Sequence, residues 1–121
     1  DHKEAPQSVA NLVALGTGQT AWTNWKLKRE PGKKSRWAKP GTMAMVDSGS
    51  YNHGNRFFIT VRKTELEKKK KYSPFGGCTI DSVALKISEA PKLPPTTEGK
   101  KSNKPKDPVT IDRMTFRWVA N

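Results

Sequence analysis

The chain has 121 residues, a length that suits one domain and is too short for two ordinary ones. Lysine and arginine number 23 against 11 aspartate and glutamate, and the formal net charge of +12 favours contact with polyanions such as RNA, DNA or an anionic surface. The lone cysteine excludes an intrachain disulfide, and no apolar run is long enough to cross a bilayer, so we expect a soluble or peripheral protein.

The first third of the chain contains one predicted helix and one basic segment. Residues 5–15 place Val9, Leu12 and Val13 at helical spacing, which predicts a short amphipathic helix. Residues 22–40 interleave seven cations with three tryptophans and show no clean period, so we expect an irregular basic segment. Its tryptophan faces are candidates for stacking on nucleic-acid bases.

Short apolar runs predict strands in the middle of the chain. Residues 42–46 and 57–61 are typical of buried strands, and the second run is apolar enough to be a central strand. Residues 72–78 predict a third short strand, interrupted by proline and glycine. A second helix follows it, with Thr79 or Asp81 as its N-cap.

The last third of the chain is predicted to be a loop followed by a strand. Residues 91–108 are rich in proline and lysine and cannot bury much surface. Residues 109–118 alternate between apolar and polar side chains, which predicts a closing strand. Together these patterns predict a single domain over residues 1–121, mainly β, with two short helices.

Few residues indicate metal or nucleophilic chemistry. His2 and His53 are the only histidines, and no spacing of His, Cys, Asp or Glu suits a metal site, so we expect neither a metal nor another cofactor. Cys78 follows a predicted strand and is expected to be a buried small hydrophobe. Paired-carboxylate, catalytic-triad and phosphate-loop patterns are missing from the sequence.

Several blocks of sequence, in a fixed order, resemble the cyclophilin family. The run from Gly41 to Thr60, with its Asn52-His53-Gly54 loop followed by FFIT, is similar to the signature GxLSMANAGPxTNGSQFFIT. Upstream, APQSVANLVALGTGQ resembles the helix PKTVENFLALCTGE that opens many cyclophilins. Downstream, the segment around Phe75-Gly76 resembles the VFG strand and following helix, and VTIDRMTF resembles the last barrel strand.

The resemblance implies a β-barrel capped by two helices that catalyses cis/trans isomerisation of the bond before proline, a rotation with a barrier of about 18–20 kcal/mol. In this family the proline ring occupies an apolar pocket, and an arginine donates a hydrogen bond to the prolyl nitrogen as the bond twists. Phe58 matches the floor of that pocket. Arg56 stands where the family usually has glutamine and is a candidate for a relocated donor. The remaining peptide-binding positions implied by the resemblance are Val46, Asp47, Ser48, Leu66 and Tyr72.

The sequence departs from the family pattern between the first helix and Gly41. Cyclophilins carry a Phe-His-Arg strand and a Met-Gln-Gly-Gly-Asp segment there, and residues 17–41 contain no counterpart of either, so the catalytic arginine has no match. The strands that precede the first helix in the family are missing as well. We therefore expect an incomplete cyclophilin-like barrel whose open edges are covered by a partner. Alternatively, the chain joins segments whose intervening residues are not included in it.

Three functions follow from these observations. The first is a noncatalytic or weakly active subunit of a larger assembly, which holds a proline-containing peptide or protein partner around Phe58. The second is an active peptidyl-prolyl isomerase whose catalytic segment lies outside these 121 residues. The third is a basic RNA-associated protein on a cyclophilin-like fold. The start at Asp1 suggests processing or a fragment, and the sequence does not indicate a compartment.

Overall fold

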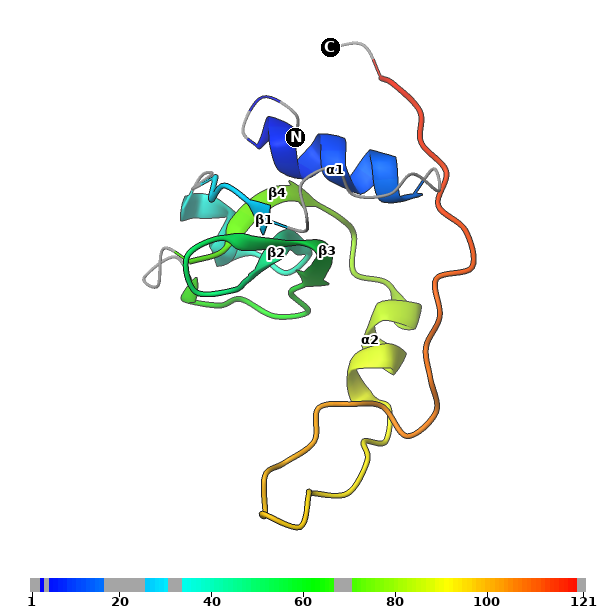
Figure 1. The fold of residues 1–121 in the computed structure, drawn as a ribbon. Helices are drawn as coiled ribbons and strands as arrows, with labels where there is room; N and C mark the ends of the chain where they lie inside the picture. Colours follow the sequence, from blue (N-terminus) through cyan, green and yellow to red (C-terminus); the bar gives the residue numbers. More distant parts are fainter. Residues whose placement is uncertain (1–2, 4, 17–25, 31–33, 67–70, 120–121) are drawn as a thin grey trace. The chain divides into compact units, whose positions relative to one another are not determined.

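The computed structural model describes residues 3, 5–16, 26–30, 34–66 and 71–119. The chain divides into two compact units, residues 1–79 with 113–121 and residues 80–112, and the predicted single domain stays a prediction. The first unit contains α1 (Pro6–Gly16), β1 (Lys26–Leu27), the 3-10 helix η1 (Lys34–Ala38), β2 (Thr42–Asp47), β3 (Asn52–Ile59) and β4 (Ser73–Gly77) (Figure 1). The second unit contains α2 (Ser82–Glu89).

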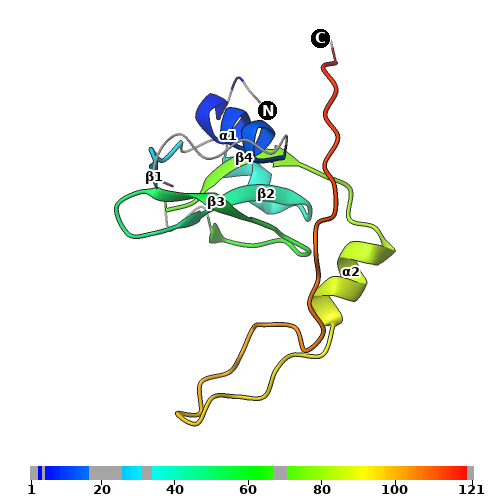
Figure 2. The same ribbon diagram turned by 45° about the vertical axis from the view of Figure 1, so that its right-hand side comes forward.

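The strands form one open antiparallel sheet with the order β1-β3-β2-β4 (Figure 2). β3 lies in the interior of the sheet, as the apolar run 57–61 predicted. It begins at Asn52, earlier than the apolar run, because Leu27 of β1 pairs with Asn52 and extends the ladder. The described fold is therefore mainly β with two α-helices and an open sheet, consistent with an incomplete cyclophilin-like fold rather than a closed barrel.

Helix α1 is capped by a side chain from outside the helix. The Glu30 carboxylate accepts hydrogen bonds from the backbone N–H groups of Gln7 at 3.0 Å and Ser8 at 2.9 Å, and from Ser8 Oγ at 2.7 Å. Backbone N–H groups in the first turn have no partner within a helix, and the positive end of the helix dipole attracts a negative charge. Glu30 thus supplies both the acceptors and the charge that the start of α1 needs.

The hydrophobic core of the first unit lies between α1 and the sheet. Its members, buried or packed against the buried residues, are Ala5, Val9, Leu12, Leu27, Met43, Met45, Phe57 and Phe75. Phe57 and Phe75 meet edge to face, with ring centroids 6.4 Å apart. Because successive strand residues point to opposite faces, the adjacent Phe58 lies on the face of the sheet away from this core.

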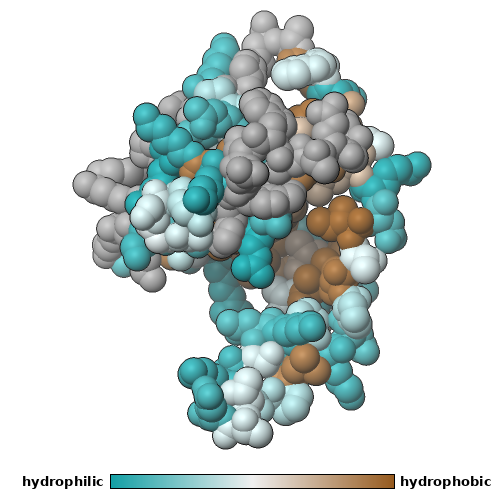
Figure 3. Space-filling model, in the orientation of Figure 1, coloured by the Kyte–Doolittle hydropathy of each residue, from teal (hydrophilic) through white to brown (hydrophobic). Residues whose placement is uncertain are grey.

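In the second unit, the predicted N-cap of α2 is confirmed at Asp81. Asp81 Oδ1 accepts a hydrogen bond from the N–H of Ala84 at 2.9 Å. The predicted loop over residues 91–108 is also confirmed, with an isolated bridge between Lys92 and Pro105. On the face drawn in Figure 3, most side chains of this loop have hydrophilic or intermediate hydropathy.

Two local predictions are wrong. Residues 109–118 form no strand, although they alternate as a strand would, because no neighbouring backbone in the described structure pairs with them. Their exposed hydrophobic residues include Ile111, at 63% exposure, and Trp118, at 86%. Cys78 is exposed instead of buried, because β4 ends at Gly77 and the chain leaves the sheet there.

Candidate functional site

Three aromatic side chains meet on the face of the sheet that carries Phe58. Phe58 and Tyr72, which directly precedes β4, meet edge to face with ring centroids 5.3 Å apart at 82°. Trp37 of η1 stacks on Phe58 at 6.2 Å and 21°, and its ring lies 6.3 Å from Tyr72. Trp37 is 2% exposed, whereas Phe58 and Tyr72 are half-buried. The structure thus brings together two predicted site residues and adds Trp37, which the sequence did not place at the site.

Trp37 is built into the first unit. Its carbonyl accepts a hydrogen bond from the N–H of Thr64 at 3.1 Å, which ties η1 to the loop after β3. A buried indole cannot stack on nucleic-acid bases, so the base-stacking prediction is wrong for Trp37. The other two tryptophans of the basic segment, Trp22 and Trp25, lie outside the described residues.

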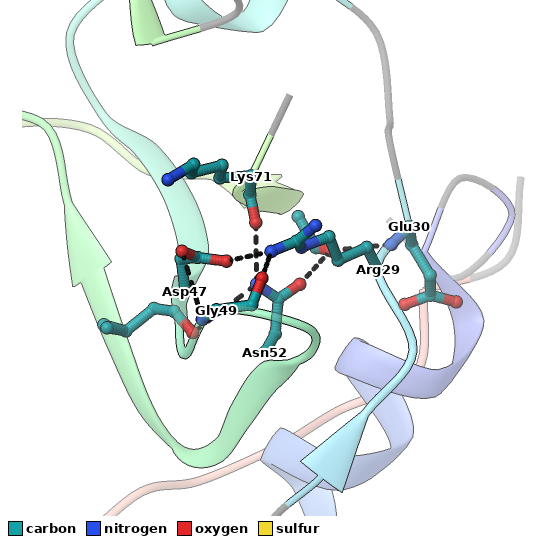
Figure 4. Close-up of polar contacts among 8 residues, drawn as sticks. Arg29, Glu30, Asp47, Gly49, Asn52 and Lys71 are labelled. Atoms are coloured by element: carbon teal, nitrogen blue, oxygen red, sulfur yellow. Dashed lines mark hydrogen bonds and ion pairs between the residues drawn. The ribbon is translucent and has the colours of Figure 1, made fainter. Parts of the chain in front are cut away.

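Asp47 ends β2 and is held by an ion pair with Arg29. Arg29 Nη2 donates to Asp47 Oδ1 at 2.6 Å and also to the carbonyl of Gly49 (Figure 4). The Gly49 N–H donates to Asp47 Oδ2 at 3.3 Å. The Ser48 N–H donates to the carbonyl of Tyr51 at 2.9 Å. Arg29 therefore fixes the turn between β2 and β3, where the resemblance implies the peptide-binding positions Asp47 and Ser48.

The ionisation of Asp47 is set by these neighbours. Burial by itself raises the pKa of Asp47, but the hydrogen bonds from Arg29 and the Gly49 N–H, with the positive charges of Arg29 and Lys71, outweigh it. The pKa of Asp47 therefore lies below its ordinary value of 3.8. At neutral pH the carboxylate is charged, and Arg29 compensates that charge.

A chain of buried and partly buried hydrogen bonds connects this turn to α1. The fully buried Asn52 donates through Nδ2 to the carbonyl of Lys71 at 2.9 Å and, more weakly, to that of Val46 at 3.4 Å. Ser73 Oγ donates to Asn52 Oδ1, and the N–H of Glu30 donates to Ser73 Oγ at 2.7 Å (Figure 4). Because the Glu30 carboxylate caps α1, the network reaches from the helix to the carbonyl that precedes Asp47.

The remaining predicted residues flank these two features. Val46 and Ser48 are half-buried on either side of Asp47, and Leu66 is half-buried in the loop after β3. Arg56 is exposed and lies where the register between β2 and β3 shifts. Arg29 was missed because its partner lies 18 residues away, and the irregular basic segment offers no periodicity from which the pairing follows.

Neither a metal site nor a membrane span emerges from the part of the chain that the structure describes. Within those residues, no group of three or more His, Cys, Asp or Glu side chains is placed to hold a metal ion. The described helices are too short and too polar to cross a membrane.

Comparison with known proteins relates the chain to peptidyl-prolyl isomerases. It is 32% identical over 101 residues to peptidyl-prolyl cis-trans isomerase A of Mycobacterium tuberculosis and to probable peptidyl-prolyl cis-trans isomerase A of Mycobacterium bovis. The match covers 84% of this chain and 52% of each relative, so the chain spans about half the length of these relatives. No protein-family model and no solved structure matches it. Taken with the ordered sequence blocks, this similarity supports a place for the chain in the cyclophilin-type peptidyl-prolyl cis-trans isomerase family.

Proposed function

We propose that this chain binds proline-containing segments of a partner protein at the surface formed by Phe58, Tyr72 and the turn after Asp47, and that it isomerises the prolyl bond weakly or not at all. The names of its relatives support the substrate class. The observation that carries the proposal is the aromatic cluster, in which a half-buried Phe58 is backed by the buried Trp37.

The chemistry of the cluster suits a proline ring. Proline is apolar and conformationally restricted, and proline-rich segments dock on surfaces lined by aromatic residues. The packing of Trp37 and Tyr72 around Phe58 holds that ring in place, so little side-chain freedom is lost on binding. The turn at Asp47 is fixed by Arg29 and offers ordered backbone groups to an extended peptide.

Slow turnover is part of the proposal because neither Arg29 nor Arg56 is held as a free donor against the cluster. Isomerisation is accelerated when a fixed donor approaches the prolyl nitrogen as the bond rotates. Arg29 is fixed near the site, but its Nη2 already binds Asp47 and Gly49. Arg56, two residues before Phe58, is the remaining candidate donor in β3, and it is exposed rather than held against the cluster.

The test uses a peptide containing Ala-Ala-Pro-Phe and measures both binding and isomerisation by NMR. Chemical-shift titration gives the affinity, and exchange between the cis and trans resonances gives the rate, which without catalysis takes tens to hundreds of seconds. We expect saturable binding with little change in exchange rate. Phe58→Ala should abolish binding, and the matched control Ile59→Ala, on the opposite face of the same strand, should retain it.

The outcomes separate the proposal from its main alternative. If the peptide binds neither the native chain nor any variant, the proposed function is wrong. If exchange is accelerated by orders of magnitude and Phe58→Ala removes the acceleration, the chain is an active isomerase. A second variant, Arg56→Gln, then shows whether Arg56 supplies the donor.

A place in a larger assembly is part of the same proposal. The sheet is open, with β1 and β4 at its edges, and exposed strand edges tend to pair with other chains. Size-exclusion chromatography of the isolated chain tests this point. A well-folded monomer that stays monomeric at high concentration would count against a need for a partner.

A further inference from the structure

The segments next to Phe58 carry exposed positive charge. Arg56 is exposed on β3, two residues before Phe58, and Lys71 is exposed directly before Tyr72. The carbonyl of Lys71 is fixed by Asn52 Nδ2 at 2.9 Å, so its backbone position is well defined. In Figure 4 the ammonium group of Lys71 and the carboxylate of Asp47 both lie on the side of the view away from Glu30.

A second group of cations borders Trp37. The Thr64 N–H donates to the carbonyl of Trp37 at 3.1 Å, which holds the loop after β3 against η1. Arg62 and Lys63 lie in that loop, and Lys39 directly follows η1, and all three are exposed. Segments that are far apart in the sequence therefore place exposed cations close along the chain to residues of the aromatic cluster.

Carboxylates in the same segments do not balance this charge. Asp47 is already paired with Arg29, so it contributes no net negative charge to the surface. Glu65 is the other acidic residue between η1 and residue 66. These segments thus carry five exposed cations, namely Lys39, Arg56, Arg62, Lys63 and Lys71, and two carboxylates, Glu65 and the Asp47 that pairs with Arg29.

We propose that the segments bound at this surface carry aspartate or glutamate on the residues that flank the proline. The proline ring contacts Phe58, and the flanking carboxylates are attracted by Arg56 and Lys71 on one side and by the cations next to Trp37 on the other. This inference rests on the proposed function, because it assumes that Phe58 receives the proline. It adds a selection by charge that the aromatic cluster alone does not provide.

The experiment compares three peptides that share one central proline and differ only in flanking residues, which are Asp/Glu, Ser/Gln or Lys. Affinities are measured by calorimetry with the full chain at about 50 mM and about 300 mM NaCl. Exposed ion pairs contribute little individually, so we expect the acidic peptide to bind about three- to tenfold more tightly than the neutral peptide at low salt. At high salt the difference should shrink, and the Lys peptide should bind most weakly.

Matched variants locate the effect. Arg56→Gln combined with Lys71→Gln should bring the affinity for the acidic peptide down to within about twofold of the affinity of the same variant for the neutral peptide. Lys101→Gln combined with Lys104→Gln alters the net charge equally, but at exposed loop positions outside these segments, and should keep the preference. Circular dichroism of each variant confirms that it is folded.

Each result decides a separate point. If the acidic and neutral peptides bind equally and Phe58→Ala abolishes both, the charge selection is wrong while the proposed function stands. If an acidic peptide with alanine in place of proline binds as tightly as the proline peptide, the attraction is a general one for polyanions and the inference is overturned. If no peptide binds, the proposed function fails and the inference fails with it.

Discussion

Replacing Gly41 with alanine tests how the ends of three strands are joined. Gly41 precedes β2 and has φ of +85°, a conformation that side-chain-bearing residues rarely adopt. Its N–H donates to the carbonyl of Thr60 at 2.6 Å, and its carbonyl accepts from the N–H of Cys78 at 2.8 Å. An added Cβ would collide with the Cys78 carbonyl oxygen, so the backbone after β4 would have to move.

The expected cost combines several contributions. Positive φ costs a non-glycine residue about 1–2 kcal/mol. Displacing the Cys78 backbone disrupts at least one of the two hydrogen bonds, which costs about 1–3 kcal/mol if a buried group is left unsatisfied. Lower conformational entropy of the unfolded chain returns about 0.4–1 kcal/mol. We therefore expect Gly41→Ala to lower the free energy of unfolding by about 2–4 kcal/mol.

The assay is urea unfolding followed by circular dichroism, with Gly49→Ala as the control. Gly49 also has φ of +85°, but a Cβ there meets nothing within 4 Å. The control should therefore show only the cost of positive φ, about 1 kcal/mol after the entropy gain. If the two variants lose the same free energy, the argument from the close approach of the Cys78 carbonyl is wrong.

Three further predictions concern the site and its supports. Because the pKa of Asp47 is lowered, the stability that its carboxylate contributes is complete above about pH 4 and is lost as the pH falls further. Asp47→Asn should therefore lower the free energy of unfolding in urea more at pH 6 than at pH 3. An equal loss at the two pH values would contradict the ion pair with Arg29. Glu30→Gln removes the negative charge at the start of α1 and should lower the free energy of unfolding by about 0.5–1 kcal/mol. No change in the urea midpoint would show that this charge does not stabilise the helix. Trp37→Leu removes the buried indole that packs on Phe58 and should lower the free energy of unfolding by about 2–4 kcal/mol in the same assay. An unaltered urea midpoint would mean that the packing of this indole does not stabilise the fold.

Local patterns predicted local structure well. The helical spacing of residues 5–15 corresponds to α1, and Asp81 caps α2 as expected. The run 42–46 corresponds to β2, and 72–78 contains β4. In each case the signal and the structure that it specifies lie within a few residues of each other, so the sequence is sufficient.

Features that depend on distant partners could not be predicted in this way. Apolar and polar side chains alternate over residues 109–118, which predicts a strand. A strand also requires a neighbouring backbone with which to pair, and the alternation carries no information about that partner. Trp37 meets Phe58, and Arg29 meets Asp47, across separations of about twenty residues in an irregular segment. The structure brings the rings of Phe58 and Tyr72 together, and the peptide-binding roles that the resemblance gives to these residues stay predictions.

The consecutive residues Arg29 and Glu30 reach in different directions, one to the turn at Asp47 and the other to the first turn of α1. We therefore expect a ligand that displaces the turn to act, through Arg29, on the short backbone segment that positions the Glu30 cap. Binding of a peptide at the proposed surface should then change the rate of amide hydrogen exchange at Gln7 and Ser8, in the first turn of α1.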